Sequence, residues 1–283
     1  MKTLLVLSYI QAIQLLEAKN SQKSTAVIST DLNMSKTEVN IDPRQVTFLD
    51  GEVLAWPAIT EIAGTPNACF MIHDHHIRRI QAFSQVTNRY CSLMPTRLAP
   101  TLMIAGFPMH RIKETDPHED TLTKIRMLKP VVGHVLDTAT GLGYTAIEAS
   151  KTAIQVTTIE LDPAVLEIAQ LNPWSQQLFR NPRISLLIGD SSEVIQELSN
   201  DSFSRIVHDP PSFSLAGELY SGQFYKELFR VLSRGGRLFH YVGDLQSSFG
   251  RRTIRGVVRR LVEAGFRHVM PNPKAFGIVA QKW

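Results

Sequence analysis

Short apolar runs alternate with stretches of helical spacing from about residue 116 to the end of the chain. Each run has the length of a strand, and the stretches between them place apolar residues three or four positions apart. This alternation predicts a parallel sheet with helices on both faces. The last two runs have no helix between them, which predicts an antiparallel hairpin at the sheet edge. The predicted strands cover residues 135–137, 155–159, 184–188, 204–207, 237–242, 267–270 and 276–280.

The helices predicted between these strands carry start and stop signals. Asp116 is a good N-cap residue, and Pro117 suits the first helical position that follows it. Phe224 and Leu228 belong to an apolar stripe at helical spacing, and Gly235-Gly236 are predicted to end that helix. Further helices are predicted over residues 162–171, 194–198 and 253–263.

The first 95 residues lack this rhythm. Apolar residues between positions 4 and 15 predict a buried helix, and short segments of β character follow it. Asp50-Gly51 between two such segments is a strong hairpin signal. Residues 96–115 contain three prolines and are predicted to be a connector. The sequence therefore predicts a small β-rich N-terminal module over 1–95, a connector over 96–115 and an α/β domain over 116–283.

Composition narrows the class of protein only a little. A chain of 283 residues with 43% hydrophobic and 20% charged residues is ordinary for a globular protein. The net charge of +4 mildly favours a polyanionic partner. Cys69 and Cys91 make neither a disulfide framework nor a metal quartet, which fits a reducing cytoplasm. No run approaches the ~18 apolar residues of a membrane span, so no membrane partner is expected.

One turn carries the clearest chemical signal. The stretch DTATGLGYTA joins a predicted strand to a predicted helix. Gly141, Gly143 and Ala146 fit the spacing of a dinucleotide-binding turn, with Glu160 roughly 20 residues further on. Asp137 argues against a dinucleotide, because its carboxylate would repel a pyrophosphate beside the turn. The same carboxylate suits a ligand that carries an ammonium group.

Four predicted strands end in acids, namely Asp137, Glu160, Asp190 and Asp209. The carboxyl ends of parallel strands meet at one edge of a sheet, where ligands bind in open α/β folds. Glu160 has two acceptor oxygens for the hydroxyls of a ribose, and Asp190 is able to accept from an adenine amino group. Each acid has an alternative role as a helix N-cap, and Asp190 fits that role well.

The spacing D-x-x-x-G-x-G resembles motif I of the class I S-adenosylmethionine-dependent methyltransferases. The strings DTATGLGYTA, NPWS, HDPPSFSLAGELYS and FHYVG are similar to a family of predicted archaeal-type methyltransferases. This resemblance implies an α/β fold with a Rossmann-like, seven-stranded, mostly parallel sheet, and S-adenosylmethionine as cofactor. The residues that it implies for cofactor binding are Asp137, Thr138, Gly141, Leu142, Gly143, Glu160, Leu161, Asp190 and Ser191.

Asp209-Pro210-Pro211 resembles the N/D-P-P-Y/F motif of enzymes that methylate exocyclic or side-chain nitrogens. In those enzymes the acid and a proline carbonyl accept hydrogen bonds from the target amine and aim its lone pair at the methyl group. Ser212 departs from the motif, since an aromatic residue is usual there, and Phe213 follows it. The resemblance implies catalytic roles for His208 and Asp209, and acceptor contacts for Pro210, Pro211, Phe213 and Tyr220.

Two other functions compete with this interpretation. Glu218-Leu219-Tyr220 resembles the region after the fourth strand of spermidine synthases, which transfer an aminopropyl group from decarboxylated S-adenosylmethionine to an amine. Arginines at helical spacing over residues 251–260 would suit nucleic-acid binding without catalysis, or an RNA acceptor, although a solvated face is the commoner explanation. The acceptor is left open between RNA and a small amine, and so is the oligomeric state.

His208 and the histidine run at residues 73–76 can each be explained by a structural role instead of a chemical one. His208 is either a proton acceptor or a buried polar neighbour of the motif. The run His73-Asp74-His75-His76 places three imidazoles close together, but it is predicted to form a hairpin turn whose alternate side chains point apart. No metal site is predicted.

Overall fold

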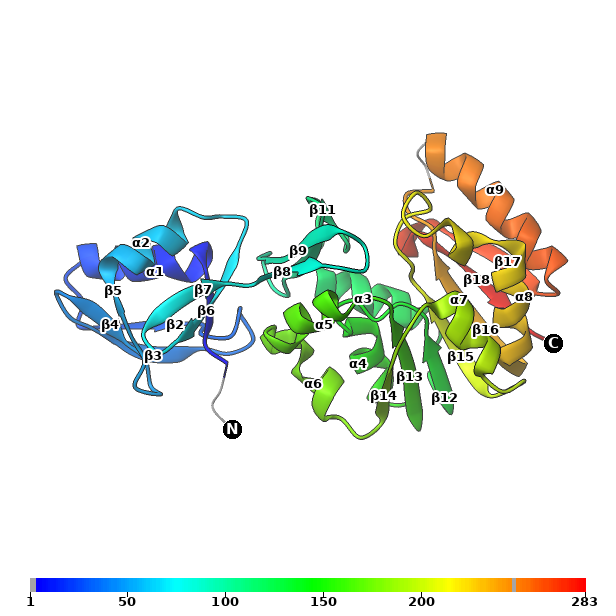
Figure 1. Cartoon of the computed structure of the whole chain (residues 1–283), viewed down its shortest axis with the longest axis horizontal. Helices are drawn as coiled ribbons and strands as arrows, with labels where there is room; N and C mark the ends of the chain where they lie inside the picture. Colours follow the sequence, from blue (N-terminus) through cyan, green and yellow to red (C-terminus); the bar gives the residue numbers. More distant parts are fainter. Residues whose placement is uncertain (1–3, 246–247) are drawn as a thin grey trace. The chain divides into compact units, whose positions relative to one another are not determined.

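The computed structural model describes residues 4–245 and 248–283, and side chains over 4–245 and 253–283. The chain divides into two compact units, each built from two segments of sequence. One comprises Met1–His118 with Ala164–Gln176, and the other comprises Glu119–Pro163 with Gln177–Trp283. Figure 1 shows the course of the chain. No helix among the described residues is long and apolar enough to cross a membrane.

A seven-stranded sheet forms the centre of the second unit, in the order β14-β13-β12-β15-β16-β18-β17. The first five strands in this order run parallel, and β18 lies antiparallel between β16 and β17. The predicted α/β fold with a mostly parallel sheet is confirmed, and so is the closing antiparallel hairpin. The strands are β12 (His134–Asp137), β13 (Gln155–Glu160), β14 (Ile184–Ile188), β15 (Phe203–His208), β16 (Leu232–Tyr241), β17 (Arg267–Asn272) and β18 (Gly277–Gln281).

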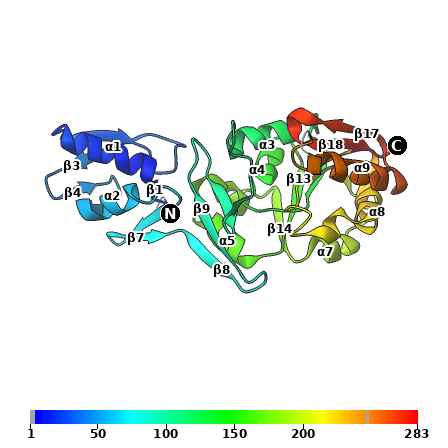
Figure 2. The ribbon, with the colours of Figure 1, turned by 90° about the horizontal axis from the view of Figure 1, so that it is seen from above.

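The strand order reverses direction between β12 and β15. Right-handed crossovers put the helices before and after such a reversal on opposite faces of the sheet, and Figure 2 shows α4 and α7 on opposite sides. Ligands of open α/β sheets bind at this point, beyond the carboxyl ends of the strands. The helices are α3 (Pro117–Arg126), α4 (Tyr144–Ser150), α5 (Pro163–Gln170), α6 (Gln176–Arg180), α7 (Ser191–Glu197), α8 (Gly222–Val231) and α9 (Ser248–Glu263).

The face that carries α7, α8 and α9 holds a hydrophobic core. Phe224 and Leu228 of α8 pack there with Val257 and Leu261 of α9. The stripe predicted for α8 is therefore the buried one. The helix ends at Val231 rather than at the glycine pair predicted to stop it, because β16 already begins at the next residue.

The first unit begins with a strand and not with the predicted helix. Residues Val6–Ser8 form β1, which pairs antiparallel with β6 (Cys69–His73), and α1 follows over Tyr9–Asn20. The Ser8 hydroxyl accepts from the amide of Ile10, and the Gln11 side chain accepts from the amide of Ser8. This capping box starts the helix at its observed position.

The remaining elements of the first unit include three that the sequence analysis missed. Helix α2 (Trp56–Ala63) follows directly after a predicted strand. The stretch predicted as a connector contains β10 (Thr101–Ile104) and β11 (Phe107–Pro108), which complete a four-stranded sheet. Residues 101–104 and 107–108 of the predicted connector are therefore strands. The other strands are β2 (Thr25–Ile28), β3 (Thr37–Ile41), β4 (Gln45–Thr47), β5 (Val53–Ala55), β7 (His76–Arg79), β8 (Gln81–Ser84) and β9 (Arg89–Met94).

Two local predictions in the N-terminal half are confirmed. Strands β4 and β5 pair antiparallel around Asp50-Gly51, where Gly51 has φ +85°. Helix α3 begins at Pro117, and the Asp116 carboxylate accepts a hydrogen bond from the amide of His118. The N-cap signal therefore located the start of α3 to the residue.

Candidate active site at the ends of the parallel strands

The glycine turn after β12 has one side open and one side packed. Gly141 has φ +53°, and a Cβ built there would meet no atom within 4 Å. Gly143 has φ +75°, but a Cβ there would lie 2.8 Å from Leu178 Cδ2. Gly141 therefore leaves room for a ligand to approach the backbone, whereas Gly143 allows the turn to pack against Leu178.

Asp137 ends β12 and is completely buried. Its Oδ2 accepts hydrogen bonds from the hydroxyls of Thr145 at 2.9 Å and Thr158 at 3.0 Å. Its Oδ1 is equally buried and has no hydrogen-bond partner among the described residues. Burial raises the pKa of Asp137 to about 7, and the two hydroxyls oppose that rise. A buried acceptor oxygen without a donor is what a bound ammonium group would satisfy.

Glu160 ends β13 and is clamped by the backbone around it. Its Oε2 accepts from the amide of Gly141 at 2.7 Å, and its Oε1 accepts from the amide of Asp162 at 3.0 Å. Burial raises the pKa of Glu160 to about 7, and these amides work against the shift. The carboxylate therefore lies against the glycine turn in a fixed orientation. Each oxygen has a further lone pair with which to accept from a ligand hydroxyl.

Other residues predicted to bind the cofactor have more structural roles. Asp190 caps α7, because its Oδ1 accepts from the amide of Ser192 at 2.7 Å. The Ser191 hydroxyl donates to the carbonyl of Thr138 at 2.6 Å and links α7 to the end of β12. Leu142 is completely buried, while Leu161 is 44% exposed. The N-cap alternative considered for Asp190 is thus present, and it occupies one of the two carboxylate oxygens.

The residues at these strand ends fit a ligand of the adenosylmethionine type. The open space over Gly141 and the unpartnered Oδ1 of Asp137 are both features that a ligand would fill. Glu160 adds a rigid pair of acceptors beside them. Such a ligand combines an ammonium group with ribose hydroxyls, and these three features supply matching partners for both.

His208 is a structural histidine in this geometry. Its Nε2 donates to the carbonyl of Leu219 at 2.9 Å, so Nδ1 accepts from the Thr138 hydroxyl at 2.7 Å. The ring is completely buried, and burial lowers its pKa to about 3. A neutral ring with both nitrogens engaged has no free site for a proton from a substrate. The geometry therefore favours the buried polar neighbour over the proton acceptor.

A second buried histidine lies beside the first and was not singled out from the sequence. The rings of His208 and His240 are 4.3 Å apart between centroids. His240 Nδ1 donates to the His208 carbonyl at 3.2 Å, and the Tyr225 hydroxyl donates to His240 Nε2 at 2.9 Å. Burial lowers the pKa of His240 as well. The two histidines therefore connect β15 to β16 directly before Asp209 in the chain.

Asp209 belongs to a buried ion cluster, which we call the lysine triad and which comprises Asp120, Lys124 and Asp209. Lys124 Nζ lies 2.6 Å from Asp209 Oδ2 and 2.8 Å from Asp120 Oδ2. It also lies 4.4 Å from the centre of the Tyr241 ring, at cation–π distance. Neither Lys124 nor Asp120 was predicted from the sequence as a site residue. The only signal was their i, i+4 spacing on α3, which is common on solvated helix faces.

The residues after Asp209 form a small aromatic group. The Tyr220 hydroxyl donates to the Pro211 carbonyl at 3.0 Å. The Phe213 ring lies 5.6 Å from that of Tyr220 in an edge-on arrangement, and Phe213 is 50% exposed. The structure therefore brings the two predicted aromatic contacts together and leaves one of them accessible from outside.

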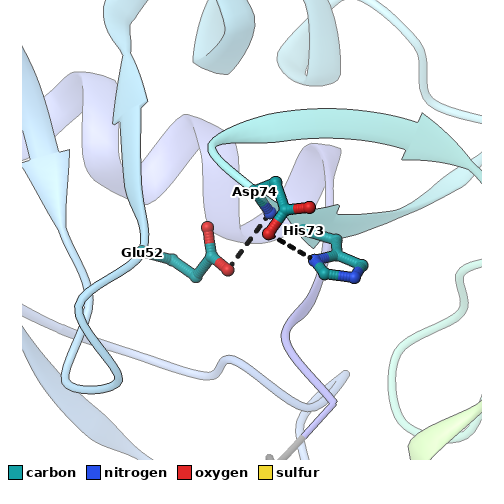
Figure 3. A group of neighbouring side chains, drawn as sticks. All are labelled: Glu52, His73 and Asp74. Atoms are coloured by element: carbon teal, nitrogen blue, oxygen red, sulfur yellow. Dashed lines mark hydrogen bonds and ion pairs between the residues drawn. The ribbon is translucent and has the colours of Figure 1, made fainter.

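The histidine run of the first unit forms the predicted hairpin turn. His73 pairs with His76 across β6 and β7, and the two residues between them have positive φ. Figure 3 shows the Glu52 carboxylate beside His73 and Asp74. One potential metal-ligand atom from each of the three residues lies within 4.8 Å of the other two. The Glu52 carboxylate accepts hydrogen bonds from the backbone amides of Asp74 at 3.2 Å and His75 at 2.8 Å. These bonds give the carboxylate a structural role in holding the turn.

The arginine-rich segment lies on α9. Arg255 and Arg259 are exposed, and Val257 on the same helix is completely buried. Arg251 and Arg252 lie outside the residues whose side chains the structure describes. The described part agrees with an amphipathic helix that turns its basic residues outward.

Nearly the whole chain is similar to the uncharacterized protein MJ1233 of Methanocaldococcus jannaschii. The two are 42% identical over 284 residues, which cover 98% of this chain and 96% of the archaeal protein. The chain belongs to the family of this archaeal protein. No protein-family profile matches the chain.

The chain also has more distant similarity to polyamine aminopropyltransferases. The polyamine aminopropyltransferase of Sulfurisphaera tokodaii is 26% identical over 175 residues, which is 59% of this chain. The chain spans only 58% of that relative's length. The similarity therefore covers only a part of each protein, and it does not by itself show that this chain has the relative's activity.

Solved structures with the same fold include two spermidine synthases. One, in complex with the transition-state analogue AdoDATO, matches with a TM-score of 0.57 at 17% identity, over 71% of this chain and 72% of the other. The enzyme from Thermotoga maritima gives a TM-score of 0.55 at 17% identity, over 71% of each chain. At these identities the likeness shows the fold alone.

Proposed function

We propose that the chain transfers a methyl group from S-adenosylmethionine to a nitrogen nucleophile. The observation that supports this most is the position of Asp137 and Asp209 at the ends of neighbouring strands, where the strand order reverses. One carboxylate has a buried oxygen without a donor, and the side chain of the other is 18% exposed. Donor and acceptor would then meet between two adjacent strand ends.

The donor side of the proposed site uses the glycine turn. Asp137 would pair with the ammonium group and Glu160 with the ribose hydroxyls, while Gly141 leaves space beside the backbone. The donor supplies an alkyl group on a positively charged sulfur. Asp190 would contribute the oxygen that does not cap α7.

The acceptor side rests on Asp209 and the two prolines that follow. Asp209 and the Pro210 carbonyl would accept hydrogen bonds from the target nitrogen and direct its lone pair toward the donor. The Tyr220 hydroxyl already engages the Pro211 carbonyl, which fixes the turn. Positive charge develops on the nitrogen as it attacks, and a nearby carboxylate stabilises that charge.

Aminopropyl transfer from decarboxylated S-adenosylmethionine is the second candidate. The partial similarity to polyamine aminopropyltransferases and the shared fold of the spermidine synthases favour it. The motif Asp209-Pro210-Pro211 favours methyl transfer, because it resembles nitrogen methyltransferases and differs from the pattern of spermidine synthases. Both candidates use the same donor site and the same acceptor acid.

Product analysis separates the two candidates. Wild-type protein and an Asp209→Ala variant are incubated with either donor and with RNA and small amines, and products are identified by mass spectrometry. A nitrogen that gains a methyl group, with loss of transfer in the variant, supports the proposal. A product that gains an aminopropyl group establishes the second candidate. Equal transfer by the variant removes Asp209 from the mechanism.

A further inference from the structure

We infer that Lys124 is the internal counter-ion of the acceptor acid, a positioning residue that makes the site accept an uncharged nitrogen and reject polyammonium chains. The inference rests on the proposed function, because it assigns Asp209 to the acceptor side. It adds a residue and a selectivity that the motif itself does not contain.

The geometry of the lysine triad fixes the orientation of Asp209. Lys124 holds one carboxylate oxygen of Asp209 at 2.6 Å and is itself held by Asp120, one helical turn earlier on α3. The side chains of Lys124 and Asp120 are 3% and 1% exposed, against 18% for Asp209. Of the three side chains, that of Asp209 is the most exposed.

Within the triad, Lys124 is the one cation, and it faces the carboxyl groups of Asp209 and Asp120. Burial raises the pKa of Asp209, and the neighbouring Lys124 opposes that rise. Burial by itself would lower the pKa of Lys124, but Asp209 and Asp120 together raise that pKa above its usual value. The lysine is therefore protonated and has no lone pair with which to accept an alkyl group. The Tyr241 ring lies over its Nζ, 4.4 Å from the ring centre.

This balance selects the kind of nitrogen that binds. A polyamine brings two or more positive charges, and it would have to compete with Lys124 for the same carboxylate. An uncharged NH₂ group needs only acceptor oxygens, and the lysine does not repel it strongly. The carboxylate of Asp209 would become useful as a counter-charge only as the nitrogen turns positive during attack.

Changing one charge at a time tests the inference. Lys124→Met leaves two buried carboxylates without their cation, and Lys226→Met removes an exposed lysine of α8 as a matched control. Spermidine is the cationic probe, and its binding is measured by calorimetry with S-adenosylhomocysteine present. We expect Lys124→Met to bind spermidine about tenfold or more tightly than wild type, because a repelling cation is gone. Lys226→Met should match wild type.

One outcome of the spermidine titration would overturn the inference. Spermidine binding by Lys124→Met that is no tighter than by wild type overturns the inference. If the variant does not fold, the wild-type protein decides alone: micromolar spermidine binding overturns the inference, and weak or absent binding supports it. Absence of any binding of S-adenosylmethionine and its decarboxylated form to wild type would instead refute the proposed function.

Discussion

Two carboxyl groups with raised pKa values dominate the chemistry at the scale of single residues. Burial brings Asp137 and Glu160 to a pKa of about 7, from ordinary values near 4. Between about pH 4 and about pH 7, the folded protein therefore binds more protons than the unfolded chain. Its free energy of unfolding should fall as the pH rises through that window. Ionisation at neutral pH thus has a cost in stability that a cationic ligand would offset.

Affinity for S-adenosylmethionine should consequently depend on pH. An ammonium group pairs with the ionised form of Asp137, so we expect affinity to increase about tenfold from about pH 6 to about pH 8. Calorimetry across that range measures it. Asp137→Asn should bind weakly and with a smaller pH dependence than wild type, because only Glu160 would still titrate in this range. A wild-type affinity that is flat over the range would contradict the assignment of Asp137 to the ammonium group.

The two glycines of the turn should respond differently to substitution. Gly141→Val fills open space and should abolish binding of S-adenosylmethionine. Because residue 141 has a positive φ, the valine should also lower the free energy of unfolding by about 1 kcal/mol. Gly143→Ala brings a Cβ against Leu178 and should chiefly lower the free energy of unfolding. Calorimetry and thermal melting on both variants separate the effects. Undiminished affinity in Gly141→Val would mean that the ligand lies elsewhere.

The sequence predicted which strand-end residues form the site, but it did not predict the charged and hydrogen-bonding partners around them. An acid after an apolar run and a glycine turn are local patterns, so Asp137, Gly141 and Glu160 were found without the fold. Lys124 was missed because its partner Asp209 is far away along the chain. The neutral state of His208 depends on Thr138 and on the Leu219 carbonyl, which only the fold brings to the ring.

At the scale of elements, the histidine pair connects the strands that carry the site. His208 links β15 to Thr138 after β12 and to the Leu219 carbonyl in the segment that follows Asp209. His240 continues the connection into β16. The elements that hold Asp137 and Asp209 therefore share one buried hydrogen-bond network.

His208→Phe tests this structural role. The substitution leaves the Thr138 hydroxyl and the Leu219 carbonyl without their partner, so we expect the free energy of unfolding to fall by about 1–3 kcal/mol. Chemical denaturation measures it. The pH profile of the remaining transfer should keep its shape, since a neutral buried histidine does not titrate there. A profile that loses a step near neutral pH would restore His208 as a proton acceptor.

Elements with strong periodicity were predictable, and those that depend on distant pairing were not. The parallel strands and α8 carry continuous apolar patterns, and most of their limits fell within a few residues of the prediction. β10 and β11 lie in a proline-containing stretch and exist because they pair with β9 and with each other. The N-terminal strand β1 is likewise defined by its pairing with β6 and by the capping box that begins α1.

At the scale of the whole molecule, the chain combines a parallel-sheet unit that carries the candidate site with a second unit of small sheets and helices. The similarity to the archaeal relative covers 98% of the chain and therefore extends over both units. The acids of the site all belong to the parallel-sheet unit.

Parallel calorimetric titration of the wild-type protein with S-adenosylmethionine, its decarboxylated form and NAD tests the central claim most directly. The proposed site predicts tight binding of S-adenosylmethionine, weaker binding of the decarboxylated form and no binding of NAD. Preference for the decarboxylated donor would establish aminopropyl transfer in place of methyl transfer. Binding of NAD alone would contradict the account, because Asp137 beside the glycine turn should repel a pyrophosphate.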